Sequence, residues 1–109
     1  MNSITTKASL TAPRRRLLEA MQRLNFGRIE GLVIRAGGQP TFEPPPRIVH
    51  DIKLGAEIGA RPELTLEDFP LKRQVVEMFE HLSLLGDGSV ATIHVQNGLP
   101  CRLTVQQPV

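Results

Sequence analysis

The sequence predicts an α+β fold in which two helices pack on one face of a mainly antiparallel sheet. Apolar residues recur at helical spacing in two separate segments, and short runs of aliphatic and β-branched residues bounded by glycine turns follow each segment. The expected element order is α-β-β-β-α-β-β, which amounts to two helix-plus-hairpin units. Because a chain of 109 residues supplies one hydrophobic core, we expect both units in a single domain at residues 11–109.

The first helix is expected to begin at Thr11-Ala12-Pro13, because threonine suits an N-cap and proline suits the first helical turn. Asn25-Phe26-Gly27 would end this helix. Residues 1–10, which precede it, are mostly small and polar, and we expect a disordered tail there. The apolar stripe of the helix consists of Leu17, Leu18, Met21 and Leu24.

Three strands are expected to follow. The first covers residues 28–35, and a turn at residues 36–39 leads to a returning strand at residues 40–43. The triple proline at residues 44–46 has no amide hydrogens for a strand ladder, so it must lie at a sheet edge or outside the sheet. Residues 47–54 alternate and predict a third strand. Its apolar face would hold Ile48, His50, Ile52 and Leu54, with His50 as a half-buried structural histidine.

The second helix is expected to begin near Pro70, after Thr65, Glu67 and Asp68, which suit a helix N-terminus. Its apolar stripe could form a groove for a partner, but packing on its own sheet is the simpler interpretation. The stripe consists of Leu71, Val75, Met78, Phe79, Leu82 and Leu85.

The last hairpin has two candidate registers. A two-residue turn at Asn97-Gly98 would pair Val95 with Pro100 and Ile93 with Arg102, which mixes apolar and polar faces. A three-residue loop at residues 96–98 would instead pair Ile93 with Cys101 and Ala91 with Leu103. We therefore predict the three-residue loop, a positive φ at Gly98, and Cys101 on the inward face of its strand.

The two units also resemble each other. Leu17-Leu18-Glu19 matches Val75-Val76-Glu77, and Gly38-Gln39-Pro40 matches Gly98-Leu99-Pro100. Chance similarity is the alternative, but we favour duplication, because a lone helix and hairpin cannot cover their own apolar face. The units would cover residues 11–54 and 68–109, joined by a connection at residues 55–67.

The first unit resembles the short YezD-like proteins of bacteria over about half of the chain. The resemblance implies a fold of roughly one helix and one hairpin per unit, and it implies no activity. The triple proline and the second unit depart from the family pattern. The residues that carry the resemblance are Leu24, Phe26-Gly27, the strand from Ile29 to Ile34, Gly38 and Arg47-Ile48.

Composition argues against several functional classes. Aromatic residues make up only 4% of the chain, with no Trp and no Tyr, which disfavours base-stacking platforms. The single cysteine, Cys101, excludes an intrachain disulfide and a cysteine-based zinc site. Because the longest apolar stretches are far too short for a membrane span and the N-terminus lacks a secretory signal, we expect a cytoplasmic protein that does not contact membranes.

No motif for catalysis stands out. Glu77 and His81 are four residues apart on one helical face, and His94 lies on the polar face of the last hairpin, so together they could in principle bind zinc. The pattern lacks a second spaced ligand pair. We therefore expect no enzymatic activity, no metal and no cofactor.

One local rule is broken at the first helix. Arg14-Arg15-Arg16 fill its first turn, where the helix dipole disfavours positive charge. In one interpretation these arginines and Arg23 contact an anion or a partner protein. In the other, which we favour, the turn is solvated and pairs with Glu63, Glu67 and Asp68 of the same or a neighbouring chain.

Charge is also uneven along the chain. Residues 1–36 carry seven basic and two acidic side chains, a net charge of +5, whereas residues 37–109 carry six basic and nine acidic ones, a net charge of −3. We therefore expect a non-enzymatic interaction or regulatory module that self-associates, most simply as a homodimer, or binds an acidic protein. The alternative is a nucleic-acid-binding accessory protein that uses an arginine set which can extend to Arg28. The set consists of Arg14, Arg15, Arg16, Arg23 and Arg28.

Overall fold

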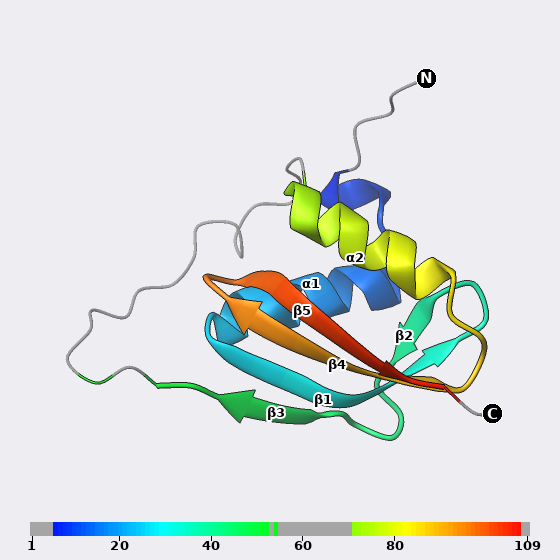
Figure 1. The fold of residues 1–109 in the computed structure, drawn as a ribbon. Coiled ribbons are helices and arrows are strands. Elements are labelled where there is room, and N and C mark those ends of the chain that lie inside the picture. The colour runs from blue at the N-terminus through cyan, green and yellow to red at the C-terminus, as the bar shows by residue number, and fades with distance from the viewer. Residues whose placement is uncertain (1–5, 53, 55–70, 108–109) are drawn as a thin grey trace.

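A computed structural model describes residues 6–52, 54 and 71–107. It shows the predicted α+β class, with two α-helices and a five-stranded antiparallel sheet in the predicted order (Figure 1). The elements are a short 3-10 helix η1 (Lys7–Ser9), α1 (Ala12–Leu24), β1 (Gly27–Arg35), β2 (Gln39–Thr41), β3 (Arg47–His50), α2 (Arg73–Ser83), β4 (Ser89–Gln96) and β5 (Leu99–Gln106).

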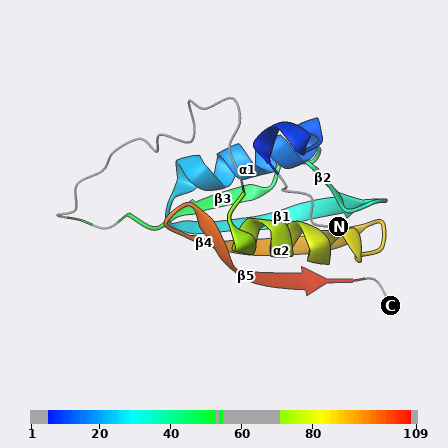
Figure 2. The same cartoon turned by 90° about the horizontal axis from the view of Figure 1, so that it is seen from above.

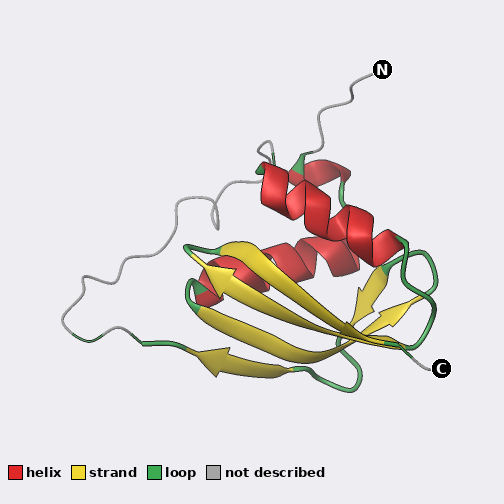
Figure 3. Ribbon diagram, in the orientation of Figure 1, coloured by secondary structure: helices red, strands yellow, loops and turns green. Residues whose placement is uncertain are grey.

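The sheet has the strand order β2-β1-β4-β5, with β1 and β4 side by side at its centre (Figure 3). The short strands β2 and β3 share the other side of β1. β3 pairs with residues 27–30 and β2 with residues 33–35. Between these two stretches Gly31 has a φ of +75°, and the β1–β4 register shifts between Ile29 and Leu32. This bulge bends β1 at the point where its pairing partner changes from β3 to β2.

Both helices cover one face of the sheet, as predicted. α1 packs against β1 and β2, and α2 packs against β5. Figure 2 shows the two helices running roughly along the strands, with α2 over β4 and beside β5. Their apolar stripes enter one shared core, in which Leu17, Leu24, Val75 and Leu82 are at most 6% exposed. The inward residues of the sheet that complete this core are Ile29, Leu32, Ile34, Ala91, Ile93 and Val95.

The helix boundaries follow from local capping. Thr11 caps α1 through its hydroxyl, which accepts a hydrogen bond from the Arg14 N–H, and Asn25 ends the helix with a φ of 64°. α2 begins at Arg73 after Lys72, whose side chain makes no capping hydrogen bond. The predicted start at Pro70 and the predicted capping residues at 65–68 lie outside the described residues.

The N-terminal segment departs from the predicted tail. Residues 7–9 form η1, and Leu10 belongs to the core. The Lys7 ammonium, whose side chain is 4% exposed, forms an ion pair of 3.1 Å with Glu19. The segment is ordered because this ion pair and the burial of Leu10 offset the entropy of fixing it. Residues 1–5 lie outside the described part of the chain.

The third strand is shorter and more exposed than predicted. It ends at His50, which is exposed, and Ile48, Ile52 and Leu54 are 43%, 70% and 89% exposed. Among the described residues, β3 is an edge strand that pairs only with β1, and the helices pack over β1, β2 and β5 instead. The alternating pattern therefore predicted a strand correctly but a buried face wrongly.

The predicted three-residue loop of the last hairpin is wrong: the hairpin has the two-residue turn that we rejected, and beyond a bulge it follows neither predicted register. A two-residue turn at Asn97-Gly98, with φ values of 54° and 73°, places Gln96 opposite Leu99 and Val95 opposite Pro100. A bulge then shifts the register between Val95 and His94, so that Ile93 lies opposite Leu103. The extra residue restores the apolar face without a longer loop. The positive φ predicted at Gly98 is present, but both registers require it.

Candidate functional site

Arg14, predicted as an anion or partner contact, is bound within the fold. Its Nη2 donates hydrogen bonds to the carbonyls of Gly37 (3.0 Å) and Gly38 (3.4 Å) and to the Ser83 hydroxyl (2.9 Å). Its guanidinium also lies over the Phe79 ring, 5.4 Å from the centroid. The cation thus lies at the C-terminal end of α2, where a helix dipole favours positive charge.

The other three predicted arginines face different surroundings. Nη2 of Arg15 donates to the carbonyls of Ala8 (3.5 Å) and Leu10 (3.3 Å) and so holds the N-terminal segment on α1. Arg16 lies over the Phe42 ring at 4.3 Å, and Arg23 is exposed in the last turn of α1. The four arginines therefore do not form one surface. Their predicted acidic partners at positions 63, 67 and 68 lie outside the described residues.

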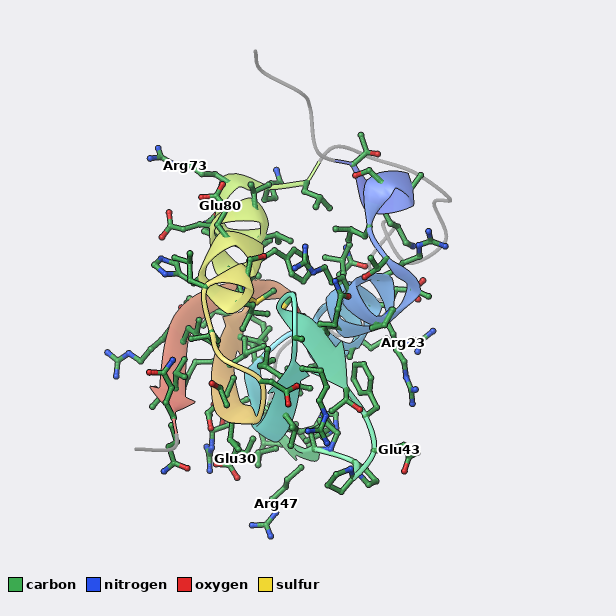
Figure 4. The ribbon with its side chains drawn as sticks, turned by 90° about the vertical axis from the view of Figure 1, so that its right-hand side faces the viewer. Arg23, Glu30, Glu43, Arg47, Arg73 and Glu80 are labelled. Atoms are coloured by element: carbon green, nitrogen blue, oxygen red, sulfur yellow. The ribbon has the colours of Figure 1, made fainter. Side chains whose placement is uncertain are left out.

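A second group of cations lies on the face of the sheet that points away from the helices, which we call the open face. Its residues alternate with the buried residues along each strand. Figure 4 shows two of its side chains, Glu30 and Arg47, pointing away from both helices. The open face consists of Arg28, Glu30, Val33, Arg47, Val49, Val90, Thr92, His94, Arg102, Thr104 and Gln106.

Three basic side chains of the open face form one row across the strands. Arg28 of β1 lies opposite His94 of β4, and His94 lies opposite Arg102 of β5. The sequence placed His94 and Arg102 on a polar face, but neither candidate register pairs them with each other. The bulge between Val95 and His94 brings Arg102 opposite His94.

One carboxylate lies among these cations. Nε of Arg28 donates to Oε2 of Glu30 at 2.6 Å. This hydrogen bond lowers the pKa of the Glu30 carboxyl, and the charges of Arg28, Arg47 and His94 lower it further. The same hydrogen bond and the charge of Glu30 raise the pKa of Arg28. On the open face the three arginines Arg28, Arg47 and Arg102 outnumber the one carboxylate, Glu30, so the formal charge of these four residues is positive.

Two grooves meet at the bulge of the last hairpin. The larger, of about 590 Å³, adjoins the row at His94 and Arg102 and extends to Asp51 and Phe26. The smaller, of about 420 Å³, runs between α2 and β5. Cys101 borders both grooves and is exposed, contrary to the predicted inward position, because the bulge turns it out of the core. Its thiol donates to the His94 carbonyl at 3.4 Å.

The edges of the sheet differ. On one side β2 has three residues and β3 has four, and the proline run lies between them. On the other side β5 has eight residues and pairs only with β4 among the described strands. Proline, short strands and bulges block edge-to-edge pairing. The half of β5 beyond the bulge, residues 103–106, contains no proline and no bulge.

The described residues bear on two further classes of site, metal centres and membrane spans. Within residues 6–52, 54 and 71–107, no three His, Cys, Asp or Glu side chains gather as metal ligands, so Glu77, His81 and His94 are not brought together. No helix of the described residues is long and apolar enough to cross a membrane.

Comparison with known proteins adds no relative to this description. No protein-family model, curated protein sequence or solved structure matches the chain.

Proposed function

We propose that this protein is a non-enzymatic binding module that self-associates by pairing β5 with β5 of a second copy. The observation that carries the proposal is the part of β5 beyond its bulge, residues 103–106, whose outer side has no strand partner among the described residues. Every second residue of such a strand directs its N–H and C=O outward. Two antiparallel copies of β5 would satisfy these groups across a two-fold axis.

The side chains of β5 suit pairing with an identical strand. Leu103 and Val105 point to the helix-covered side of the sheet but are only half-buried, because no strand of the described chain lies beyond them. In a β5–β5 pair the same two residues of each copy would lie side by side and extend the core. Arg102, the single charged residue of β5, points to the opposite face.

The groove beside β5 supports the same arrangement. It is lined by Met78 of α2 and by Leu99 and Leu103 of β5, together with the polar side chains of Gln74 and His81. An added strand would direct alternate side chains into this groove. The occupant that we propose is the Leu103–Val105 segment of a second copy, since it presents small aliphatic side chains at strand spacing.

The arrangement of the units supports our prediction of an internal repeat. Each unit contributes one helix and a hairpin, and the inner strands β1 and β4 pair antiparallel at the centre of the sheet. The Gly98 N–H donates to the Asn25 carbonyl at the end of α1, and Gly38 closely approaches Ser83 at the end of α2. We propose that the two units arose by duplication. A cytoplasmic location and an acidic protein partner stay predictions from the sequence.

Sedimentation of the chain at micromolar concentration tests self-association. We expect a species of twice the 12.1 kDa chain mass. Val105→Lys should give the monomer, because a charge directed inward from an edge strand prevents pairing. Ala36→Lys, which adds the same charge at the exposed β1–β2 turn, should stay dimeric.

Two outcomes would overturn the proposal. One is a wild-type chain that sediments as a monomer in both low and moderate salt. The other is a dimer that persists in the Val105→Lys variant while circular dichroism shows that the variant is folded. Hydrogen exchange of the Leu103 and Val105 amides is a second measurement, because both should be protected in the dimer and become less protected on dilution.

A further inference from the structure

We infer that the open face binds the phosphodiester backbone of a nucleic acid through Arg28, Arg47 and Arg102, independently of the bases. The inference concerns a surface and a ligand that differ from those of the proposed self-association, and it does not depend on it. It also differs from the arginine cluster of α1, because Arg14 and Arg15 donate to carbonyls of their own chain.

The geometry of the row is the first argument. Arg28, His94 and Arg102 occupy directly opposed positions on three adjacent strands, which places their Cα atoms within a span of about 10 Å. Arg47 lies opposite Glu30 on β3 and extends the cationic surface past β1. Arg28 and Arg102 thus lie two strands apart on the same face of the sheet, where one polyanion could contact both.

The state of each guanidinium is the second argument. Arg28 uses Nε for its bond to Glu30, so its terminal nitrogens can still donate to an anion. Arg47 and Arg102 are exposed. Arginine presents a planar fork of donors that matches two phosphate oxygens at once.

Acidic side chains lie within and beside the cationic surface. Glu30 lies among the cations, and Asp51 lies in the groove beside His94 and Arg102. At the far end of β1, Arg35 forms a 4.0 Å pair with Asp87. The surface available to an anion is therefore the stretch from Arg47 across Arg28 to Arg102.

The remaining side chains favour nucleic acid over an acidic protein. A stable protein interface usually includes large apolar or aromatic anchors. The described side chains of the open face offer only valine, threonine and glutamine besides the charged groups and His94. Contacts to phosphates need no such anchors. Because phosphate contacts carry no information about the bases, we expect binding that does not depend on the base sequence.

Fluorescence anisotropy with labelled oligonucleotides of about 15 nucleotides, at about 50 mM salt, tests the inference. The double variant Arg47→Gln/Arg102→Gln should bind single-stranded DNA at least about fivefold more weakly than the wild type. Its slope of log affinity against log salt should be less steep by about 1.4. Comparing the affinities for a single-stranded and a duplex probe shows which form of DNA the open face binds more tightly.

The matched control removes two basic side chains elsewhere. Lys72→Gln/Arg73→Gln lowers the net charge equally, but both residues are exposed at the start of α2. Figure 4 shows Arg73 on the helix side of the molecule, away from the open face. We expect this control to keep the wild-type slope. Equal losses in the two double variants would show attraction by net charge alone and would overturn the inference.

A gain-of-affinity variant gives an independent readout. Glu30→Gln removes the carboxylate within the cationic surface and should strengthen DNA binding about threefold, whereas Glu80→Gln on the outer side of α2 should leave it unchanged. Tighter binding to polyglutamate than to DNA of equal charge would assign the face to an acidic protein and overturn the nucleic-acid assignment. A lack of measurable binding to either DNA probe at low salt would also overturn it.

Discussion

The guanidinium of Arg14, in the first turn of α1, donates a hydrogen bond of 2.9 Å to the hydroxyl of Ser83, the last residue of α2. The two residues are 69 positions apart. This contact explains why an arginine occupies a helix N-terminus, where its charge is unfavourable. The favourable interactions of Arg14 are with the opposite end of the other helix and with the carbonyls of Gly37 and Gly38. Arg14 thus fixes α1, the β1–β2 turn and α2 to one another.

Replacing Arg14 should therefore destabilise the fold. We expect Arg14→Ala to lower the free energy of unfolding by about 1.5–3 kcal/mol, because hydrogen bonds from a charged donor are lost at a half-buried position. Arg23→Ala, at an exposed position of the same helix, should change it by less than about 0.5 kcal/mol. Urea denaturation measures both values. Similar small effects for the two variants would mean that Arg14 does not hold the elements together.

The β1–β2 turn offers two neighbouring glycines in the same backbone conformation but with different surroundings. Gly37 and Gly38 have φ values of +79° and +72°. A Cβ on Gly38 would lie 2.5 Å from Ser83 Cα, whereas a Cβ on Gly37 would meet no atom within 4 Å. Gly37→Ala should cost about 1 kcal/mol for the left-handed backbone alone. Gly38→Ala should cost more, because backbone atoms of α2 would have to move.

Thermal or urea unfolding of the two glycine variants gives the comparison directly. The difference between them isolates the close approach of the turn to α2, since the backbone strain is common to both. Equal losses of stability would show that this approach is not a constraint on the fold.

The exposed thiol of Cys101 should react in the folded protein. The bulge of β5 directs Cys101 towards solvent, between the two grooves. A disulfide reagent should modify one thiol per chain without denaturant, and Cys101→Ser should change the free energy of unfolding by less than about 0.5 kcal/mol. A thiol that reacts only after denaturation would support the inward position that the sequence suggested.

The pair of Arg28 and Glu30 predicts a dependence of stability on pH. Its hydrogen bond lowers the pKa of Glu30 below the ordinary value of 4.5 in the folded protein. The stabilisation from ionised Glu30 is therefore complete above 4.5 and is lost as the pH falls through the lowered pKa. We expect the stability advantage of wild type over Glu30→Gln to be larger near pH 7 than near pH 3. Urea denaturation at both pH values measures it, and an advantage that is independent of pH would contradict the assignment.

The local patterns of the sequence were sufficient for the helices and the fold class. The stripe of α1 and the capping residue Thr11 lie within one stretch of chain, so their spacing alone specifies the helix and its buried side. The stripe of α2, from Val75 to Leu82, is predictable in the same way. Strand-forming runs follow each helix, and a shared sheet built from them can bury both stripes, which predicts the α+β class.

The sequence by itself determined where the helices and most strands form, because those choices depend on neighbours within a few residues. Only the tertiary structure decided the bulge at Cys101, the exposure of β3, the order around Leu10 and the role of Arg14. Each of these depends on contacts between distant residues. A two-residue turn with a bulge and a three-residue loop bury similar side chains, so the local pattern cannot separate them. The row of Arg28, His94 and Arg102 became visible only once pairing across three strands was known.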